Sequence, residues 1–527
     1  MSIRQSPKTK LFSLLLATAV LSACGGGGSS STAAAPVQPV YTAIFDAGSS
    51  GTRLSFYKVI PSQGGYPIIE KIATYDKDLD LVTDDDGIND FLNGNGEIVL
   101  SAGDEQPVGC PGTPVAKGDN RIISGLTRND VEPCVLQPLL QQLDSGIASL
   151  NAKDPNLKLT KSQVKVELFA TAGMRTEDVR NGGSKTTAQI EQYYGEMKAY
   201  TTTWGYDAGA FKTINGNSEE GVWTWINLND YYYNAFGGNP TKSATIQSPV
   251  GDFEVGGSSM QIAFPTNLSP SDRDNVYQVS INGKTFNVYS KTFLGLGGDD
   301  ARKFVRAFNY NTQDGGLNCY ASTAKVSNTK EGSGVQLYPS NQVISGAYPF
   351  PANINLNTPW TTLAASAFNL TTSPNVGGYD FSGCSSKYST IIDQVISLQR
   401  NKYGTLNEGD IATIGSFKTK LQSSTAQFVG LDNFYYSADD LNYKPSTGFV
   451  ASEFKTKLLN YCAGQVADNK SLQNVCPNGT FMYDFLFGAN GLFNGGTATF
   501  AGVQSTKENG DTVLTWTRGY LLQKYAQ

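Results

Sequence analysis

Two short loops rich in glycine and serine carry residue types that bind phosphate. The first, residues 46–52 (DAGSSGT), lies between an apolar segment at 40–45 and a segment at 53–59 in which apolar and polar residues alternate. This pattern predicts a strand, a tight turn and a second strand. Small turn residues expose successive backbone N–H groups and hydroxyls that bind phosphate oxygens, and Asp46 at the strand end can hold a metal ion through water.

The same design returns in the second half of the chain. Residues 254–259 read EVGGSS, and Met260, Ile262 and Phe264 then share one face of a predicted strand. A single glycine-serine turn is most often an ordinary hairpin. Two copies, each led by a carboxylate and each in its own half, favour duplicated domains that bind one polyphosphate from opposite sides.

Two segments between the loops add reactive groups. Residues 164–175 predict a strand that runs into a small-residue turn ending at Arg175, with Thr171 and Arg175 placed to face a cleft between the two halves. Residues 214–225 lead from a polar turn into a predicted helix, with Glu219 and Glu220 at the junction. The competing interpretation is structural: acids in a first helical turn often serve only the helix dipole, and such an arginine often only pairs with a nearby carboxylate.

The chain contains no histidine. Serine-histidine and cysteine-histidine triads are therefore excluded, and the cysteine spacings do not fit a zinc site. A hydrolytic base must then be a carboxylate or, less readily, a tyrosine or lysine. The net charge of −6 argues against a nucleic acid polymer as partner, because binding one needs a basic surface.

The N-terminal sequence is typical of an export signal. A basic stretch precedes an apolar segment at 11–20, too short for a permanent membrane helix, and the sequence LSAC ends at Cys24. This resembles bacterial lipoprotein processing, which would remove residues 1–23 and lipidate Cys24, leaving 24–39 as a flexible tether. The chain would then be held to a bacterial membrane, with the outer membrane favoured, on its periplasmic or surface side. The alternative is ordinary secretion with cleavage nearby.

The other six cysteines are expected to pair, because an exported protein meets an oxidising compartment. Six cysteines allow many pairings that the sequence does not resolve. Proximity in the chain favours Cys110 with Cys134, Cys319 with Cys384, and Cys462 with Cys476.

Together the motifs resemble the apyrase, or ecto-nucleoside triphosphate diphosphohydrolase (NTPDase), family of the actin, hexokinase and Hsp70 superfamily. The segments similar to its five conserved regions are, in order, 46–53, 170–175, 214–225, 254–262 and 427–436. Weaker similarities at 293–302, 476–483 and 516–520 keep the family's order. The pairs Cys110–Cys134 and Cys462–Cys476 also look like family disulfides.

The resemblance implies hydrolysis of terminal phosphates of nucleoside tri- and diphosphates with Mg²⁺ or Ca²⁺. Glu220 would be the general base, and Ser259 and Gln261 would hold the attacking water. Asp46 and Glu254 would hold the ion through its waters, while Arg53 and Arg175 would support the loops electrostatically. The implied phosphate-binding residues are Ser49, Ser50, Gly51, Thr52, Thr171, Gly256, Gly257 and Ser258. The candidates for stacking on the nucleobase are Tyr435, Tyr436, Phe481 and Tyr483.

The implied fold is α/β, with two ribonuclease-H-like lobes flanking a nucleotide-binding cleft. The first lobe would take residues 40–213 plus 492–527, and the second 214–491. Three features depart from the family pattern: Glu254 stands where aspartate is usual, Asn217-Ser218 contains one extra residue, and the segment at about 320–378, rich in Ser, Asn, Thr and Pro, looks like a family-variable insertion without an assigned role.

Two alternatives remain at this stage. An exopolyphosphatase or sugar kinase of the same superfamily shares paired phosphate loops, although the EEGVWTW segment and the cysteines point away from both, and export removes a kinase from its ATP. A surface lipoprotein that only binds nucleotides or a host ligand is the alternative outside enzymes.

Overall fold

The computed structural model describes most of the chain beyond residue 37. The described residues are 38–49, 51–62, 65–74, 87–100, 103–117, 120–178, 184–239, 248–270, 275–308, 317–321, 378–402, 414–421, 424–464, 472, 474–495, 498–508 and 511–526. The predicted signal, the predicted lipidation site Cys24, nearly all of the predicted tether and Ser50 lie outside these residues.

Two mixed β-sheets form the framework of residues 38–527. The first has the order β3-β2-β1-β7-β8 and the second the order β11-β12-β10-β9-β13-β14. The strands of the first are β1 (Val40–Gly48), β2 (Gly51–Ile60), β3 (Ile68–Thr74), β7 (Val164–Ala170) and β8 (Asp207–Thr213); those of the second are β9 (Gly251–Val255), β10 (Ser259–Pro265), β11 (Val276–Ile281), β12 (Lys284–Leu294), β13 (Gln427–Asp432) and β14 (Thr499–Val503). The expected α/β fold with two related halves is confirmed in this form.

The two sheets repeat one pattern. In the first, β1 is antiparallel to β2 and parallel to β7; in the second, β9 is antiparallel to β10 and parallel to β13. Strands β1 and β9 are therefore equivalent, and so are the carboxylates Asp46 and Glu254 that they carry. In such sheets ligands bind at the carboxyl ends of the parallel strands, where the strand order reverses.

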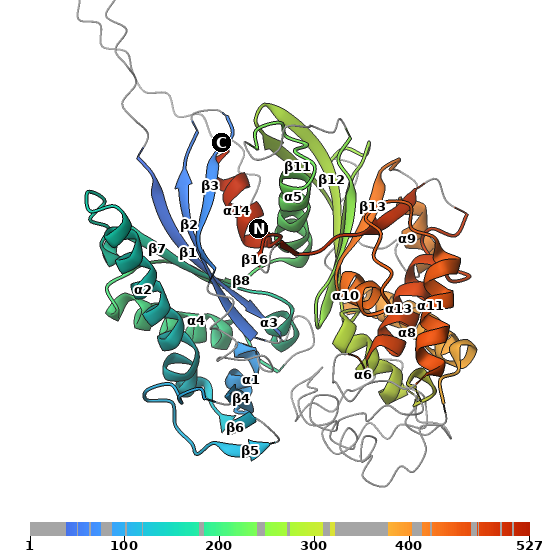
Figure 1. Cartoon of the computed structure of the whole chain (residues 1–527), viewed down its shortest axis with the longest axis horizontal. Helices are drawn as coiled ribbons and strands as arrows, with labels where there is room; N and C mark the ends of the chain where they lie inside the picture. The colour runs from blue at the N-terminus through green and yellow to red at the C-terminus, as the bar shows by residue number, and fades with distance from the viewer. Residues whose placement is uncertain are drawn as a thin grey trace, which may run out of the picture. The chain divides into compact units, whose positions relative to one another are not determined.

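Helices cover both sheets. Those of the first half are α1 (Ile88–Asn93), α2 (Gln137–Lys153), α3 (Ala172–Glu177), α4 (Thr187–Thr203) and α5 (Val222–Tyr231); those of the second are α6 (Gly298–Phe308), α8 (Phe381–Lys402), α9 (Ile414–Leu421), α10 (Asn433–Asp440), α11 (Ala451–Ala463), α13 (Val475–Phe487) and α14 (Trp516–Tyr525). Helices α2 and α4 cover the first sheet, and α8 and α13 pack beside the second (Figure 1). Each half has its own apolar core, and Met260, Ile262 and Phe264 enter the second core as predicted.

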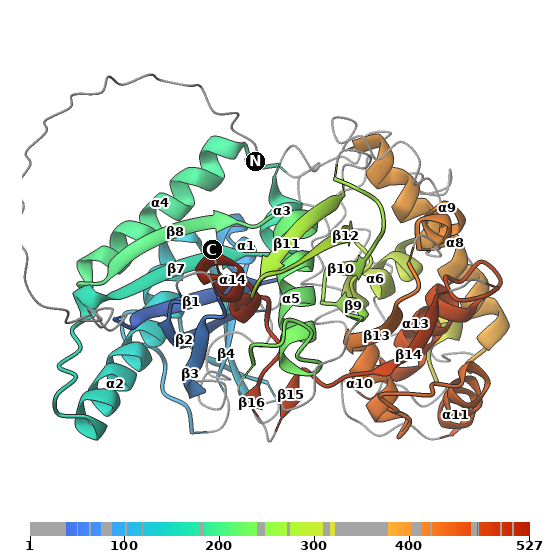
Figure 2. The ribbon, with the colours of Figure 1, turned by 90° about the horizontal axis from the view of Figure 1, so that it is seen from above.

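Helices α5 and α14 lie between the two sheets in both views (Figure 1; Figure 2). They share a third core with residues of β1, β7 and β12, including Ile44, Phe169 and Val288. The carbonyl of Trp223 on α5 lies so close to Gly519 on α14 that a β-carbon at Gly519 would overlap it. This contact joins the halves and brings the end of the chain beside the predicted cleft.

The C-terminal segment does not return as a whole to the first sheet. Strand β14 pairs in parallel with β13 of the second sheet, and Leu492 and Phe500 belong to the second core. Only α14 contributes to the core shared with the first sheet. The expected assignment of 492–527 to the first lobe therefore fails for residues 492–503, because their apolar side chains pack against β13.

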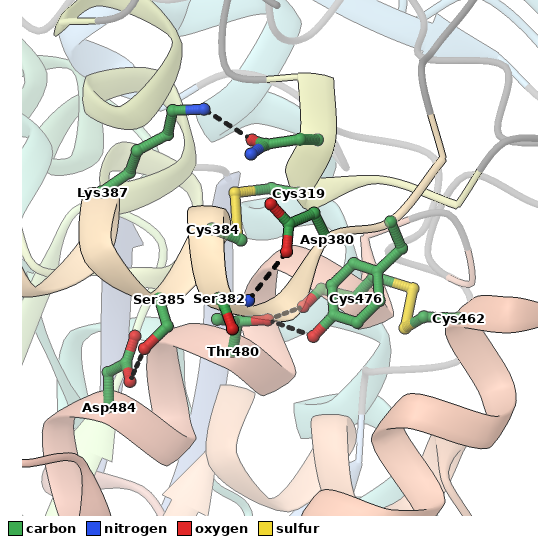
Figure 3. Close-up of a disulfide and its surroundings, with 12 residues drawn as sticks. Cys319, Asp380, Ser382, Cys384, Ser385, Lys387, Cys462, Cys476, Thr480 and Asp484 are labelled. Carbon is green, nitrogen blue, oxygen red and sulfur yellow. Dashed lines mark hydrogen bonds between the residues drawn. A yellow bond between two sulfur atoms is a disulfide. The ribbon is translucent and has the colours of Figure 1, made fainter.

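All three expected disulfides are present: Cys110–Cys134, Cys319–Cys384 and Cys462–Cys476. Figure 3 shows the last two beside helices α8 and α13, where all four cysteines belong to the second core. Among the described residues, no helix combines the length and apolar character needed to cross a membrane.

Candidate active site

The first glycine-serine loop is the turn of a tight hairpin. Gly48 pairs with Gly51, which leaves only two residues between β1 and β2. Gly51 has a φ of 144°, a conformation that favours glycine because a β-carbon would be strained there. Asp46 and Arg53 are cross-strand partners and therefore project from the same face of the sheet, beside the turn.

The second loop, residues 256–258, faces the first. A β-carbon built on Gly257 would lie 3.0 Å from Oγ of Ser49. The loop is held from behind, because the N–H groups of Gly298 and Asp299 at the start of α6 donate to the carbonyls of Gly256 and Gly257 at 2.9 and 3.0 Å. The two predicted phosphate loops thus oppose each other across a narrow gap.

Glu220 is carried by a single π-helical turn, Gly216–Gly221, that leads into α5. The N–H groups of Glu219 and Glu220 both donate to the carbonyl of Asn215, at 3.1 and 3.0 Å, which makes this turn wider than an α-turn. The extra residue noted at Asn217-Ser218 is accommodated here, so α5 continues unbroken. Asn217 fixes the turn to β12, since its Oδ1 accepts from the N–H of Thr292 at 2.7 Å.

The structure separates the roles of the two adjacent glutamates. Glu219 turns away to pair with Lys212 and to accept from the N–H of Asn215. Glu220 is 5% exposed and lines the cavity described below. Its carboxylate lies 2.6 Å from the guanidinium of Arg175. Arg175 therefore does pair with a carboxylate, as the structural interpretation required, but that carboxylate is the predicted base.

Ser259 and Gln261 complete a network around Glu220. Nε2 of Gln261 lies 2.9 Å from Oε2 of Glu220 and 2.7 Å from Oγ of Ser259. Arg175 donates to the same Oγ at 2.9 Å, which links α3 of the first half to β10 of the second. Of the three residues predicted to activate and hold a water molecule, Gln261 thus lies within hydrogen-bonding distance of the other two.

A cavity of about 420 Å³ lies between the two loops, within the size range of small-ligand sites. Gln261 is fully buried and is not among its lining residues, whereas the other described residues predicted to act in catalysis, phosphate binding or metal binding all line it. They are Asp46, Ser49, Gly51, Thr52, Thr171, Glu220, Glu254, Gly256, Gly257, Ser258 and Ser259. Thr171 is held there by its N–H, which donates to the carbonyl of Ala47 at 3.0 Å.

The carboxylates of the cavity fit a hydrated divalent cation. Burial raises the pKa of Asp46 to about 7, with Arg53 lowering it and Glu220 raising it. Burial, and next the charge of Glu220, raise the pKa of Glu254 well above its usual range, and Oε2 of Glu254 is buried without a hydrogen-bond partner. Within the described part of the chain, no cluster of three or more such ligands could chelate an ion directly. A cation held through its waters would favour the ionised form of both carboxyls.

Three charged residues that the sequence analysis did not single out also line the cavity: Asp299, Asp432 and Lys507. Asp432 ends β13, next to β9, and adopts a φ of 52° that is unusual for a residue with a side chain. A carboxylate at the end of a parallel strand is the signal that could have identified it. Asp299 and Lys507 carried no comparable local signal. Trp516, noted only for its family similarity, also lines the cavity and hydrogen-bonds to Asp46.

The four aromatic candidates for base stacking are not equivalent. Tyr436 lines the cavity and is 38% exposed. Tyr435 and Tyr483 are half-buried against the second core and are not among the cavity residues. Phe481 is 2% exposed inside that core, in contact with Tyr388 and Phe434. The prediction for Phe481 is therefore wrong, because its ring is already packed on apolar neighbours.

Comparison with known proteins gives consistent matches. Residues 155–525 match the model of the GDA1/CD39 (nucleoside phosphatase) family. The chain is 24% identical over 373 residues to ectonucleoside triphosphate diphosphohydrolase 2 of Gallus gallus, covering 67% of this chain and 66% of that protein. It is 23% identical over 376 residues to ectonucleoside triphosphate diphosphohydrolase 3 of Mus musculus, covering 68% and 63%. The chain thus spans just under two thirds of the length of these relatives.

A solved structure supports the same architecture. The crystal structure of nucleoside triphosphate hydrolases from Neospora caninum superimposes with a TM-score of 0.50 at 14% identity, covering 93% of both chains. At this identity the likeness concerns the fold alone.

Proposed function

Because the family match covers well over half of its residues, the chain belongs to the GDA1/CD39 (nucleoside phosphatase) family, and we propose that it hydrolyses the terminal phosphate of nucleoside tri- and diphosphates. The observation that carries this proposal is the contact of Glu220 with Gln261, which also contacts Ser259, beside two opposed phosphate loops. The names of the related diphosphohydrolases support the substrate class.

In the proposed reaction, a water molecule held by Ser259 and Gln261 attacks the terminal phosphorus. Glu220 accepts a proton from this water as the new P–O bond forms, and the anhydride P–O bond on the opposite side breaks. Orthophosphate and the shortened nucleotide leave. Little covalent work falls to the protein in such a transfer, so positioning and charge stabilisation supply most of the rate.

Arg175 would act on Glu220 and Ser259 rather than on the substrate. Its guanidinium contacts both side chains and is itself buried, so it fixes the base relative to the water-holding hydroxyl. We therefore regard Arg175 as a positioning residue.

Asp46 and Glu254 would hold Mg²⁺ or Ca²⁺ through its waters, one carboxylate from each half. When bound, the ion would supply positive charge to the phosphate oxygens. The residues of the two loops, Ser50 among them, would bind those oxygens through N–H groups and hydroxyls. Of the four aromatic candidates, Tyr436 is best placed to stack on the base, since it is the one of them that lines the cavity.

The export proposal rests on the N-terminal sequence and is consistent with three disulfides, which are typical of oxidising compartments. We propose that Cys24 carries the lipid that holds the protein to a bacterial membrane. Labelling with a fatty-acid analogue should mark the full-length chain and not its Cys24→Ser variant. Equal labelling of both would overturn the anchor while leaving the enzyme proposal intact.

A substrate panel tests the activity. Orthophosphate release is measured from ATP, ADP, GDP, UDP and inorganic tripolyphosphate, with Mg²⁺, with Ca²⁺ and with a chelator. Metal-dependent release from nucleotides is expected. Release from tripolyphosphate alone would favour an exopolyphosphatase, and nucleotide binding without any release would favour a binding lipoprotein.

A further inference from the structure

A short hairpin outside both sheets forms one edge of the cavity. Its strands are β15 (Lys507–Glu508) and β16 (Asp511–Thr512), and Lys507 and Thr512 both line the cavity. None of the roles proposed above uses this hairpin.

The hairpin is fixed by neighbours on several sides. Lys71 of β3 donates to the carbonyl of Thr512 at 3.1 Å, and Tyr232 donates to the carbonyl of Ser505 at 3.0 Å. Tyr231 hydrogen-bonds to the Glu508 carboxylate. The position of Lys507 is therefore set by the surrounding fold, although its side chain is exposed.

Charged residues of both signs line the cavity. Arg53 and Lys507 are the cationic residues among those that line it, against five carboxylates: Asp46, Glu220, Glu254, Asp299 and Asp432. Lys507 lines the cavity and forms no ion pair with a described carboxylate.

Helix α5 separates the hairpin from the base. Glu220 directly precedes the first turn of α5, whereas Tyr231 and Tyr232, which hold the hairpin, stand at its C-terminal end. At about 1.5 Å per residue, the two ends are roughly 17 Å apart. Arg53 lies beside the first phosphate loop, as the cross-strand partner of Asp46. Arg53 and Lys507 also both lower the pKa of Asp432, which burial raises to about 6.

This arrangement matches the direction of a phosphate chain. In an in-line displacement the leaving group points away from the attacking water, and hence away from Glu220. The phosphate next to the attacked one would reach Arg53, and a further phosphate, present only in triphosphates, would reach the hairpin. An ammonium group there would bind that phosphate as a point charge.

We propose that Lys507 is a specificity residue that binds the phosphate farthest from the attacked one and so favours nucleoside triphosphates over diphosphates. This rests on the proposed function, because it assumes a phosphate chain that runs from the loops toward the hairpin. Arg53 would serve both substrate classes.

The test uses the Lys507→Gln and Lys507→Arg variants of the mature chain. Lys58→Gln is the matched control, since it removes the same charge from an ion pair with Glu70 that does not line the cavity. Dissociation constants are measured by calorimetry for a non-hydrolysable triphosphate analogue, a diphosphate analogue and orthophosphate, with Mg²⁺ present. Thermal unfolding checks that each variant is folded.

For Lys507→Gln we expect triphosphate binding to weaken roughly tenfold, diphosphate and orthophosphate binding to stay within about twofold, and KM for triphosphates to rise while kcat is kept. Lys507→Arg and Lys58→Gln should resemble the unchanged protein. Equal weakening for all three ligands, or no weakening, would overturn the proposal.

Failure of the Lys507 proposal can be distinguished from failure of the proposed function. If the unchanged protein neither binds nor hydrolyses nucleotides, the proposed function fails. Tripolyphosphate and pyrophosphate then replace the nucleotides, and the same preferential loss of the longer chain in Lys507→Gln would still support Lys507, while equal losses would overturn it.

Discussion

Replacing Arg175 by methionine should destabilise the protein mainly through Glu220. The guanidinium lies 2.6 Å from the carboxylate, and the two side chains are 9% and 7% exposed. Methionine keeps much of the side-chain volume but leaves the carboxylate without its cation. Removing one partner of a buried ion pair costs about 3–5 kcal/mol. Glu220 lines the cavity and retains its hydrogen bond from the amide of Gln261 at 2.9 Å. We therefore expect the free energy of unfolding to fall by about 3 kcal/mol, at the lower end of that range.

A double-mutant cycle isolates this contribution. The free energy of unfolding is measured in urea for the unchanged protein, Arg175→Met, Glu220→Gln and the double variant. The neutral amide of the Glu220→Gln variant does not need a cation, so Arg175→Met should cost only about 1 kcal/mol in that background, a coupling of about 2 kcal/mol. If Arg175→Met costs the same in both backgrounds within about 0.5 kcal/mol, the pairing does not hold the base and this reasoning is refuted.

Three further predictions concern other parts of the molecule. Burial raises the pKa of Asp484 to about 7 from 3.8, so the folded chain retains a proton that the unfolded chain releases, and the free energy of unfolding falls as pH rises through that window. Asp484→Asn should remove up to about 4 kcal/mol of this loss, seen in urea unfolding as a variant whose advantage grows between about pH 4 and 7 and then levels off; an advantage independent of pH would contradict it. Gly519→Ala should lower the thermal unfolding midpoint, because the added β-carbon overlaps the carbonyl of Trp223, whereas helix propensity alone would stabilise by about 1 kcal/mol; a higher midpoint would show that the helices do not approach so closely. Asn217→Ala should reduce kcat roughly tenfold with little change in KM, since it removes the side-chain hydrogen bond that helps to hold the base-carrying turn to β12, and Ser218→Ala, in the same turn, is the control that should keep its rate.

Features set by short stretches of sequence could be predicted. The hairpin at 40–60 follows from an apolar segment, small turn residues and a second alternating segment, and the structure narrows its turn to two residues. The three disulfides are the ones that proximity in the chain favoured among the possible pairings. The burial of Val222, Trp225 and Ile226 follows from helical spacing beyond the loop that carries Glu220.

Features set by contacts between distant segments could not be predicted. The sequence showed the extra residue at Asn217-Ser218, but whether the chain bulges or forms a π-turn there depends on β12, which lies far away in sequence. Asp432 enters the cavity because β13 joins β9 in parallel. The placement of 492–503 with the second sheet depends on the same strand. Phe481 looked like its neighbour Tyr483 in the sequence, and only the helix orientation buries it.

The most direct test of the central claim compares the unchanged protein with its Glu220→Gln variant. Phosphate release from ATP and ADP with Mg²⁺ is measured beside nucleotide binding. We predict that release falls by at least ~100-fold, while the dissociation constant for a non-hydrolysable analogue changes less than about threefold. A variant that releases phosphate at the unchanged rate would show that Glu220 is not the base and would contradict the account.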